Sequence, residues 1–314
     1  MKKISIVTAC FNEEESVEEL CRRIKEVLVN LADYDYEHIL IDNHSTDRTV
    51  SIIKSLAAKD MRIKLIVNAR NFGAIRSGYY GFLQAQGDCV IPMAADLQDP
   101  PELIPELVKK WEEGFKVVLF VKPQSNEKWP MSAIKRYYYK FVDYISDIPL
   151  VRNATGAGLY DKRVVEILRT IDDPYPYFRG LVSEIGFPIA TIPFCQPLRQ
   201  HGVTKSNFYS LYDMAMLGIT KHSKVPLRLL TMSGFLLSLL SVLLMVFYFF
   251  MKLIYWDSFT LGMAPILLGI FFFASVQLFF MGMLGEYIGS IHTHVRKLPL
   301  VVEIERVNFE EEAN

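Results

Sequence analysis

The sequence has no charged residue over two long stretches near its carboxyl end, 229–251 and 258–285. Each stretch is long enough for the roughly 20 apolar residues that cross a bilayer as an α-helix. Helices of soluble proteins need a polar face, so two buried helices of a soluble bundle are the weaker alternative. We therefore predict that 229–285 holds two transmembrane helices, at about 229–251 and 260–284.

The sequence also lacks an excess of charge of either sign. It has 34 Lys and Arg against 35 Asp and Glu, a net charge of −1, which gives no indication of nucleic-acid binding. The basic residues are nevertheless unevenly placed around the predicted spans, and the loop that connects the spans carries one Lys and one Asp. Basic residues mark the cytoplasmic side, so we predict that both termini are cytoplasmic. The flanking residues are Lys221, Lys224 and Arg228 before the first span, and Arg296 and Lys297 after the second.

Cysteine and glycine motifs are absent where several enzyme classes need them. The four cysteines form no Cys-x-x-Cys pair and no metal-ligand spacing, which predicts reduced and mostly buried thiols. No Gly-x-Gly-x-x-Gly follows the first apolar run and no Gly-Lys-Ser/Thr loop exists, so neither a dinucleotide site nor a P-loop is supported. A sheet without a glycine-rich phosphate loop must neutralise phosphates in some other way. A divalent cation held by carboxylate and amide oxygens, with basic side chains nearby, would do so.

Residues 1–205 alternate apolar runs with helical patterns. The runs "ISIVTAC", "HILID", "IKLIV" and "DCVIPMA" are each followed by a segment with apolar residues at helical spacing. Continuous apolar strands separated by helices predict an α/β fold, a doubly wound and mostly parallel sheet covered on both faces. Ligands of such sheets bind beyond the carboxyl ends of the strands.

Acidic residues follow three of these runs. The glutamates of "FNEEE" follow the first run, Asp42 ends the second, and Asp96 follows the fourth in "MAADLQDPPE". Asp47, in "STDRT", is better explained as a cap or turn residue. Asp96 and Gln98 offer two hard oxygen ligands two residues apart, and Mg²⁺ needs only one or two protein ligands beside phosphate oxygens and water.

Four motifs in this order, followed by two spans, resemble the family 2 glycosyltransferases of GT-A fold. They are "SIVTACFNEEESV", "ILIDNHSTDRTV", "NARNFGAIRSGYYGFLQAQGD" and "MAADLQDPPELIP". More narrowly, they are similar to the polyprenyl-phosphate glycosyltransferases, the group of bactoprenol glucosyltransferase and dolichol-phosphate mannose synthase. The resemblance implies inverting transfer of a single hexose-type sugar from a nucleoside diphosphate sugar, expected to be a UDP-sugar, to undecaprenyl or another polyprenyl phosphate. It further implies a multi-pass protein at the cytoplasmic face of a bacterial inner membrane, acting in envelope glycan decoration.

The resemblance also implies roles for particular residues. Glu13, in "FNEEE", and Asp42 match residues that bind the nucleoside. Asp96 and Gln98 match the corner that binds Mg²⁺ or Mn²⁺ and the diphosphate, with Asp96 also a nucleotide contact and a catalytic residue. Arg199 and Lys205, in "RQHGVTK", match a phosphate-binding catalytic element near the membrane. The alternative for these two is that they are ordinary cations facing anionic lipid.

The sequence departs from the family pattern at three places. Ala94 stands where the first Asp of an Asp-x-Asp motif is usual, and Asn43-His44 replaces the usual Asp-Gly. The segment "NATGAGLYD" has no acid before Asp161, whereas many relatives carry an Asp soon after Thr-Gly that is proposed as a general base. A phosphate acceptor with a second pKa of about 6 is largely a dianion at neutral pH and needs no base. This favours a lipid phosphate over a sugar hydroxyl, which must lose a proton.

Two further segments and two rival functions stay open. The apolar residues within 206–228 recur at helical spacing, which predicts an amphipathic helix. This helix would lie either on the cytoplasmic leaflet or against the catalytic domain. In the cytoplasmic tail 286–314, residues 301–309 alternate like an edge strand, which pairs either with a second subunit in a homo-oligomer or with its own domain. The rivals are a glycosyltransferase with a polysaccharide acceptor and a non-catalytic sugar-nucleotide-binding membrane protein.

Overall fold

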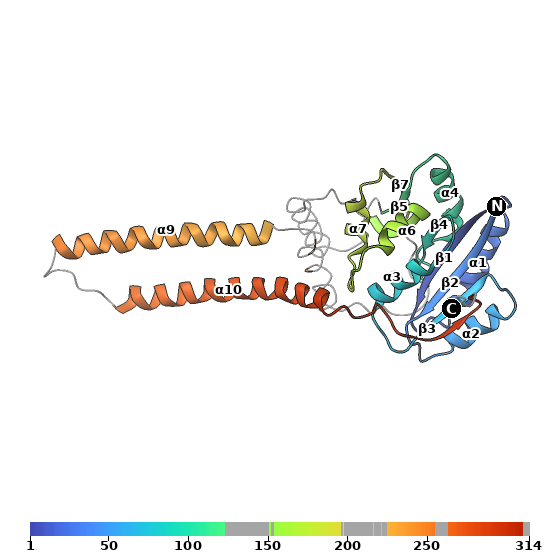
Figure 1. Cartoon of the computed structure of the whole chain (residues 1–314), viewed down its shortest axis with the longest axis horizontal. Helices are drawn as coiled ribbons and strands as arrows, with labels where there is room; N and C mark the ends of the chain where they lie inside the picture. The colour runs from blue at the N-terminus through green and yellow to red at the C-terminus, as the bar shows by residue number, and fades with distance from the viewer. Residues whose placement is uncertain are drawn as a thin grey trace.

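One eight-stranded sheet organises the amino-terminal part of the chain in the computed structural model (Figure 1). The strand order is β7-β5-β6-β4-β1-β2-β3-β8. The structure describes residues 1–122, 151, 154–195, 197, 216, 221, 225–254 and 263–309. The strands are β1 (Lys2–Cys10), β2 (Tyr34–Asp42), β3 (Ile63–Asn68), β4 (Cys89–Pro92), β5 (Val117–Val121), β6 (Ala154–Asp161), β7 (Ile189–Pro193) and β8 (Glu303–Val307).

The sheet is mostly parallel, which confirms the predicted fold class. Strand β1 pairs in parallel with β2 and β4, β2 with β3, and β5 with β7. Only β6 and β8 run antiparallel to their neighbours. The chain builds β2 and β3 on one side of β1 and then crosses to place β4 on the other, so the sheet has a topological switch point between β1 and β4. In open α/β sheets ligands bind at that point, beyond the carboxyl ends of the strands.

Helices cover both faces of the sheet and bury its apolar residues. Side chains from α1 and α4 pack on one face, and side chains from α3, α6 and α7 pack on the other. Three of the four cysteines are buried in this core and all four are free thiols, as predicted. The helices are α1 (Val17–Val29), α2 (Thr49–Ala57), α3 (Ala74–Gln84), α4 (Ile104–Glu112) with a preceding turn η1 (Pro101–Leu103), α6 (Lys162–Arg169) and α7 (Phe178–Ile185).

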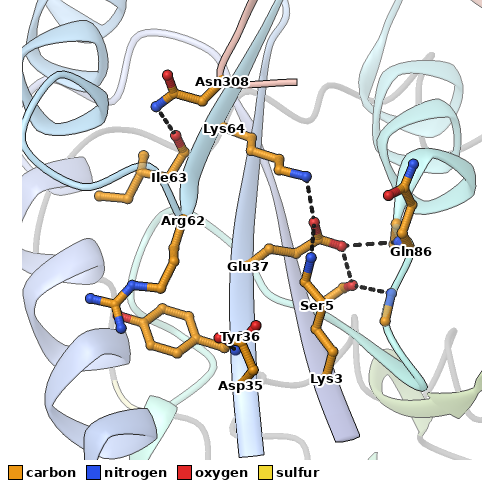
Figure 2. A network of polar contacts seen from close by, with 12 residues as sticks. Lys3, Ser5, Asp35, Tyr36, Glu37, Arg62, Ile63, Lys64, Gln86 and Asn308 are labelled. Atoms are coloured by element: carbon orange, nitrogen blue, oxygen red, sulfur yellow. Dashed lines mark hydrogen bonds and ion pairs between the residues drawn. The ribbon is translucent and has the colours of Figure 1, made fainter. Parts of the chain in front are cut away.

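A buried carboxylate, Glu37, ties β2 to its neighbours (Figure 2). Its side chain is 1% exposed, and its Oε1 accepts hydrogen bonds from Ser5 Oγ (2.6 Å) and the Gln86 backbone N–H (2.9 Å). Its Oε2 lies 2.7 Å from Lys64 Nζ and 3.1 Å from Lys3 Nζ. Burial alone would raise the pKa of Glu37, but the hydrogen bonds and the lysine charge outweigh it and lower the pKa to about 2.

We expect Glu37→Gln to lower the free energy of unfolding at pH 7 by about 3 kcal/mol, because it leaves two lysines beside a buried neutral group. A carboxyl whose folded pKa is depressed stabilises above its ordinary pKa and loses that contribution as the pH falls. The difference between the variant and the parent should therefore shrink from pH 4.5 to about pH 2. Urea unfolding in detergent measures it, and Glu19→Gln, in an exposed pair with Arg22, should change nothing. Equal losses in both variants would contradict this account of Glu37.

Two long helices project from the domain side by side (Figure 1). Helices α9 (Val225–Ile254) and α10 (Met263–Val295) each contain a stretch long and apolar enough to cross a membrane, and neither stretch is buried within the protein. The helix α10 continues to Val295, beyond the predicted end of the span at 284. Glu286 ends the uncharged run without ending the helix, and histidines in its last turn, 292 and 294, suit the negative end of the helix dipole.

The carboxyl-terminal strand β8 folds back onto its own domain. It pairs antiparallel with β3, Lys54 Nζ lies 2.7 Å from Glu305 Oε2, and Asn308 Nδ2 donates to the backbone oxygens of Ala57 and Ile63. Of the two alternatives for the predicted edge strand, the structure has the one within the chain. The predicted amphipathic helix at 206–228 falls largely outside the described residues.

Candidate active site

The loops that follow β1 and β2 are joined into one unit at the carboxyl edge of the sheet. The Asn12 N–H donates to Ser45 Oγ (2.9 Å), and Asn12 Oδ1 accepts from the Thr46 N–H (2.8 Å). The Glu13 N–H donates to Thr49 Oγ1 (2.9 Å). These bonds fix Glu13 and the end of β2 on neighbouring loops, where the sequence predicted a nucleoside site.

Three residues just past strand ends hold left-handed backbone conformations without being glycine. They are Asn12 after β1 (φ 53°), His44 after β2 (φ 68°) and Leu97 after β4 (φ 60°). Such conformations cost free energy and cluster at functional sites, where the surrounding structure holds them. His44 occupies the position at which the family usually has glycine, and its positive φ explains that preference. These three residues lie at the carboxyl edge of the sheet, the edge at which the acidic residues also lie.

Asp42 is buried at the end of β2, and only one of its two carboxylate oxygens accepts a hydrogen bond in the described part of the chain. It is 0% exposed, and its Oδ2 accepts from the Ser45 N–H (2.8 Å). Its Oδ1 is buried and has no hydrogen-bond partner within the described part of the chain. A buried carboxylate oxygen without a donor is costly. It is therefore suited to accept a hydrogen bond from a ligand that enters this edge.

The loop after β4 presents Asp96 and Gln98 on one side. Residues at 93, 95, 97 and 99 are buried, whereas those at 94, 96 and 98 are partly exposed. The loop is closed by the Gln98 N–H, which donates to Asp96 Oδ1 (3.2 Å). Ala94 shares the open side, so the missing first Asp of the family motif removes a carboxylate that would have stood beside Asp96.

Asp99 is turned inward and holds the loop instead of facing a ligand. It is 6% exposed, and its Oδ2 accepts from the Ala94 N–H (3.2 Å). Burial, and secondarily the charge of Asp96, raises the pKa of Asp99. The two carboxylates of this short motif thus have different tasks, one at the open edge and one beneath it.

The donor set at this corner fits a hard divalent cation. Asp96 and Gln98 supply carboxylate and amide oxygens on one side of the loop, the ligand types that Mg²⁺ and Mn²⁺ take. The described residues contain no group of three His, Cys, Asp or Glu side chains that would form a closed metal site. A cation here would therefore need further oxygens from a bound diphosphate and water.

Asn43, next to Asp42, positions the loop after β3 and was not predicted to do so. Its Nδ2 donates to Asn71 Oδ1 (2.9 Å), and its Oδ1 accepts from the Phe72 N–H (2.9 Å). An Asp at this position would lose the donor and place a charge against Asn71 Oδ1. In the sequence, the only indication of this contact was an asparagine after each of two neighbouring strands, Asn43 after β2 and Asn71 after β3. The loop ends at Gly73, whose φ of 85° with ψ of 156° is a region open essentially to glycine alone.

Residues 5–167 of the chain match the family described as Glycosyl transferase family 2. The chain belongs to this family. It is 32% identical over 301 residues to a prophage-derived bactoprenol glucosyl transferase of Shigella flexneri, covering 95% of this chain and 96% of that one. It is 31% identical over 309 residues to a prophage bactoprenol glucosyl transferase homolog of Escherichia coli K12, covering 97% and 99% of the two chains. The chain is thus a glycosyltransferase with a GT-A-like sheet.

Among solved structures, the glycosyltransferase is similar to glucosyl-3-phosphoglycerate synthase from Mycobacterium tuberculosis in complex with Mn²⁺, UDP and phosphoglyceric acid. The sequence identity is 19% and the TM-score 0.48, covering 70% of this chain and 76% of that one.

The glycosyltransferase has no carboxylate in the described part of β6 that faces the site. Strand β6 is antiparallel to β4, so its first residues lie at the carboxyl edge of the parallel strands and Asp161 lies at the opposite edge, paired with Cys89. Asp161 accepts from Trp111 Nε1 (2.7 Å), lies 2.9 Å from Lys116 Nζ and caps α6 through the Arg163 N–H. It is a structural residue and does not face the candidate site.

The structure shows the contacts of two further residues considered in the sequence analysis, Glu13 and Asp47. Glu13 Oε2 accepts from Ser16 Oγ (3.1 Å) at the start of α1, in the loop after β1. Asp47 accepts from the Thr49 N–H and Oγ1, which confirms its role as a turn residue. Arg199 and Lys205 lie outside the described residues.

Proposed function

We propose that the protein transfers one hexose-type sugar from a UDP-sugar to undecaprenyl phosphate, or a similar polyprenyl phosphate, with inversion at the anomeric carbon. The observation that carries the proposal is the carboxyl edge of the sheet, where Asp42 ends β2 and Asp96 and Gln98 follow β4, with β1 between these two strands. The two candidate spans and the names of the relatives support a lipid phosphate as the acceptor.

Donor binding would divide between the two loops. The Oδ1 of Asp42 would accept a hydrogen bond from the nucleobase, and Glu13 would lie beside the nucleoside. Asp96 and Gln98 would hold Mg²⁺ or Mn²⁺, which when bound supplies positive charge to the departing diphosphate. Arg199 and Lys205 would bind phosphate groups near the membrane.

The acceptor requires little proton chemistry from the chain. A phosphate monoester has a second pKa of about 6, so it attacks as an anion without a general base. The strand β6 offers no acid at the described part of the edge, which suits such an acceptor and not a sugar hydroxyl. The residues would then act by aligning the phosphate with the anomeric carbon and by stabilising the leaving group.

The proposed location is a bacterial inner membrane, with α9 and α10 as the two spans and the catalytic domain and both termini on the cytoplasmic side. In Figure 1 β1 begins at the end of the domain farthest from α9 and α10, so its carboxyl end points toward these helices. Such an orientation would bring the site toward the lipid surface. The lipid-linked sugar would then serve decoration of an envelope glycan.

Transfer in nanodiscs tests the proposal. We expect the full-length protein to convert undecaprenyl phosphate, a UDP-sugar and Mn²⁺ into a lipid-linked sugar that mass spectrometry detects, and to leave undecaprenol unmodified. A panel of UDP-, GDP- and dTDP-sugars identifies the donor. Transfer to a polysaccharide hydroxyl with no lipid-linked product would overturn the acceptor.

A further inference from the structure

Two arginines lie over one aromatic ring next to the carboxyl end of β3. The guanidinium carbon of Arg70 lies 4.0 Å from the centroid of the Phe72 ring, and that of Arg76 lies 5.5 Å from it. Arg70 is in the loop after β3, and Arg76 is in the first turn of α3. No carboxylate among the described residues forms an ion pair with either guanidinium.

Arg76 is partly withdrawn from water with a donor unused. Its Nη2 donates to the Pro299 backbone oxygen (2.5 Å), whereas its Nε is buried and has no hydrogen-bond partner in the described part of the chain. Burial, and secondarily the charge of Arg70, lowers the pKa of Arg76. Two like charges around one ring, one of them partly desolvated, repel each other unless an anion lies between or beside them.

The carboxylate on this side of α3 is committed elsewhere. Asp173 is 8% exposed, and its two oxygens lie 2.5 Å and 2.6 Å from Lys221 Nζ. His294 Nε2, in the last turn of α10, lies 3.4 Å from the same carboxylate. Asp173 is therefore paired with other basic groups and does not neutralise the two arginines.

The position of the two arginines suits a phosphate that arrives from the bilayer. The segment 296–302, the dark red trace in Figure 1, runs from the end of α10 past α3 to β8. Its Pro299 oxygen accepts from Arg76, and its Val302 oxygen accepts from the Ala69 N–H. Arg76 is thus bonded to the segment that follows α10, and the loop that carries Arg70 is bonded to Asn43, the neighbour of Asp42.

We infer that Arg70 and Arg76 together bind the phosphate of a membrane lipid, namely the polyprenyl phosphate acceptor of the proposed function, on which this inference rests. Guanidinium groups donate paired hydrogen bonds to phosphate oxygens, and a phosphate monoester carries nearly two negative charges at neutral pH. Both guanidinium groups contact the Phe72 ring, and a bound anion would offset the repulsion between their charges.

Steady-state transfer in nanodiscs of undecaprenyl phosphate and phosphatidylcholine tests the inference. We expect Arg70→Gln/Arg76→Gln to raise the KM for undecaprenyl phosphate by about tenfold or more, since two charge-assisted hydrogen-bond donors are lost. The KM for the sugar nucleotide should stay within about twofold, and Arg76→Lys should restore part of the loss. The exposed Arg22→Gln on α1 is the control, and the single Arg70→Gln serves if the double variant unfolds. An unchanged KM for the lipid, or an equal rise for the sugar nucleotide, overturns the inference.

Binding without turnover separates this inference from the proposed function. Lipid binding is titrated with undecaprenyl phosphate, undecaprenol, phosphatidylglycerol and inorganic phosphate. Retained phosphate-dependent binding that the double variant loses supports the arginine site even if the parent protein transfers no sugar. Equal binding of phosphatidylglycerol, or of inorganic phosphate alone, overturns the polyprenyl phosphate as its ligand.

Discussion

Asp96→Asn is expected to lower the rate of sugar transfer by at least about 100-fold, because it removes the only carboxylate on the open side of the loop after β4. In a site with Asp-x-Asp a second acid would keep part of the cation affinity, but here Ala94 stands in its place. The remaining oxygen ligand, the Gln98 amide, is neutral. The rate should recover partly at high Mn²⁺, since the loss lies in cation affinity.

The Asp96→Asn variant must lose cation binding without losing the folded structure. Asn keeps the shape of Asp96 and an oxygen that can accept from the Gln98 N–H, so the loop should hold. Glu106→Gln changes an exposed carboxylate on α4, near in sequence but outside the site, and should transfer at the parent rate. A fully active Asp96→Asn protein with unchanged Mn²⁺ dependence would refute the assignment of Asp96.

Asp42→Ala is expected to weaken binding of the sugar nucleotide by about 10- to 100-fold, the worth of a hydrogen bond to a charged group. The Oδ1 of Asp42 is buried without a hydrogen-bond partner in the described part of the site, so a donor group of the ligand can bind to it. The effect should appear in KM for the donor and in the affinity for UDP, with little change in kcat, because the nucleobase is remote from the reacting carbon.

The matched control for Asp42 is Asp33→Ala. Asp33 precedes β2 and Asp42 ends it, so the two acids flank the same strand at opposite edges of the sheet, and Asp33 is exposed. Its removal should leave the affinity for UDP unchanged. If Asp42→Ala binds UDP as tightly as the control, the nucleoside does not contact this carboxylate.

Part of this site could be predicted from local sequence because apolar runs mark strands and the residues just after them mark the ligand edge. Asp42 and Asp96 followed from that pattern alone. The sequence named Asp96 and Gln98 as ligand residues and gave no role to Asp99, whose burial and hydrogen bond from the Ala94 N–H only the structure shows. It also left two partners for the strand at 301–309, because alternation reveals a strand but not the strand with which it pairs.

Contacts between distant segments account for the rest. The hydrogen bond from Arg76 to Pro299 spans more than 200 residues of sequence, and no local periodicity encodes it. The role of Asn43 likewise depends on the loop after β3, to which it is bonded across two neighbouring strands. The full extent of α10 was likewise not predicted, because an uncharged run indicates the part of a helix that can lie in a membrane, whereas the helix itself continues through Glu286 to Val295.

Calorimetric titration of UDP into the full-length protein in detergent, with Mn²⁺ and with EDTA, tests the cation and nucleotide assignment most directly. We predict that UDP binds at least about tenfold more tightly with Mn²⁺ than with EDTA, because Asp96 and Gln98 need the diphosphate to complete the cation site. The Asp96→Asn protein should lose this difference. Equal affinity for UDP with and without the cation in the parent protein would contradict the account.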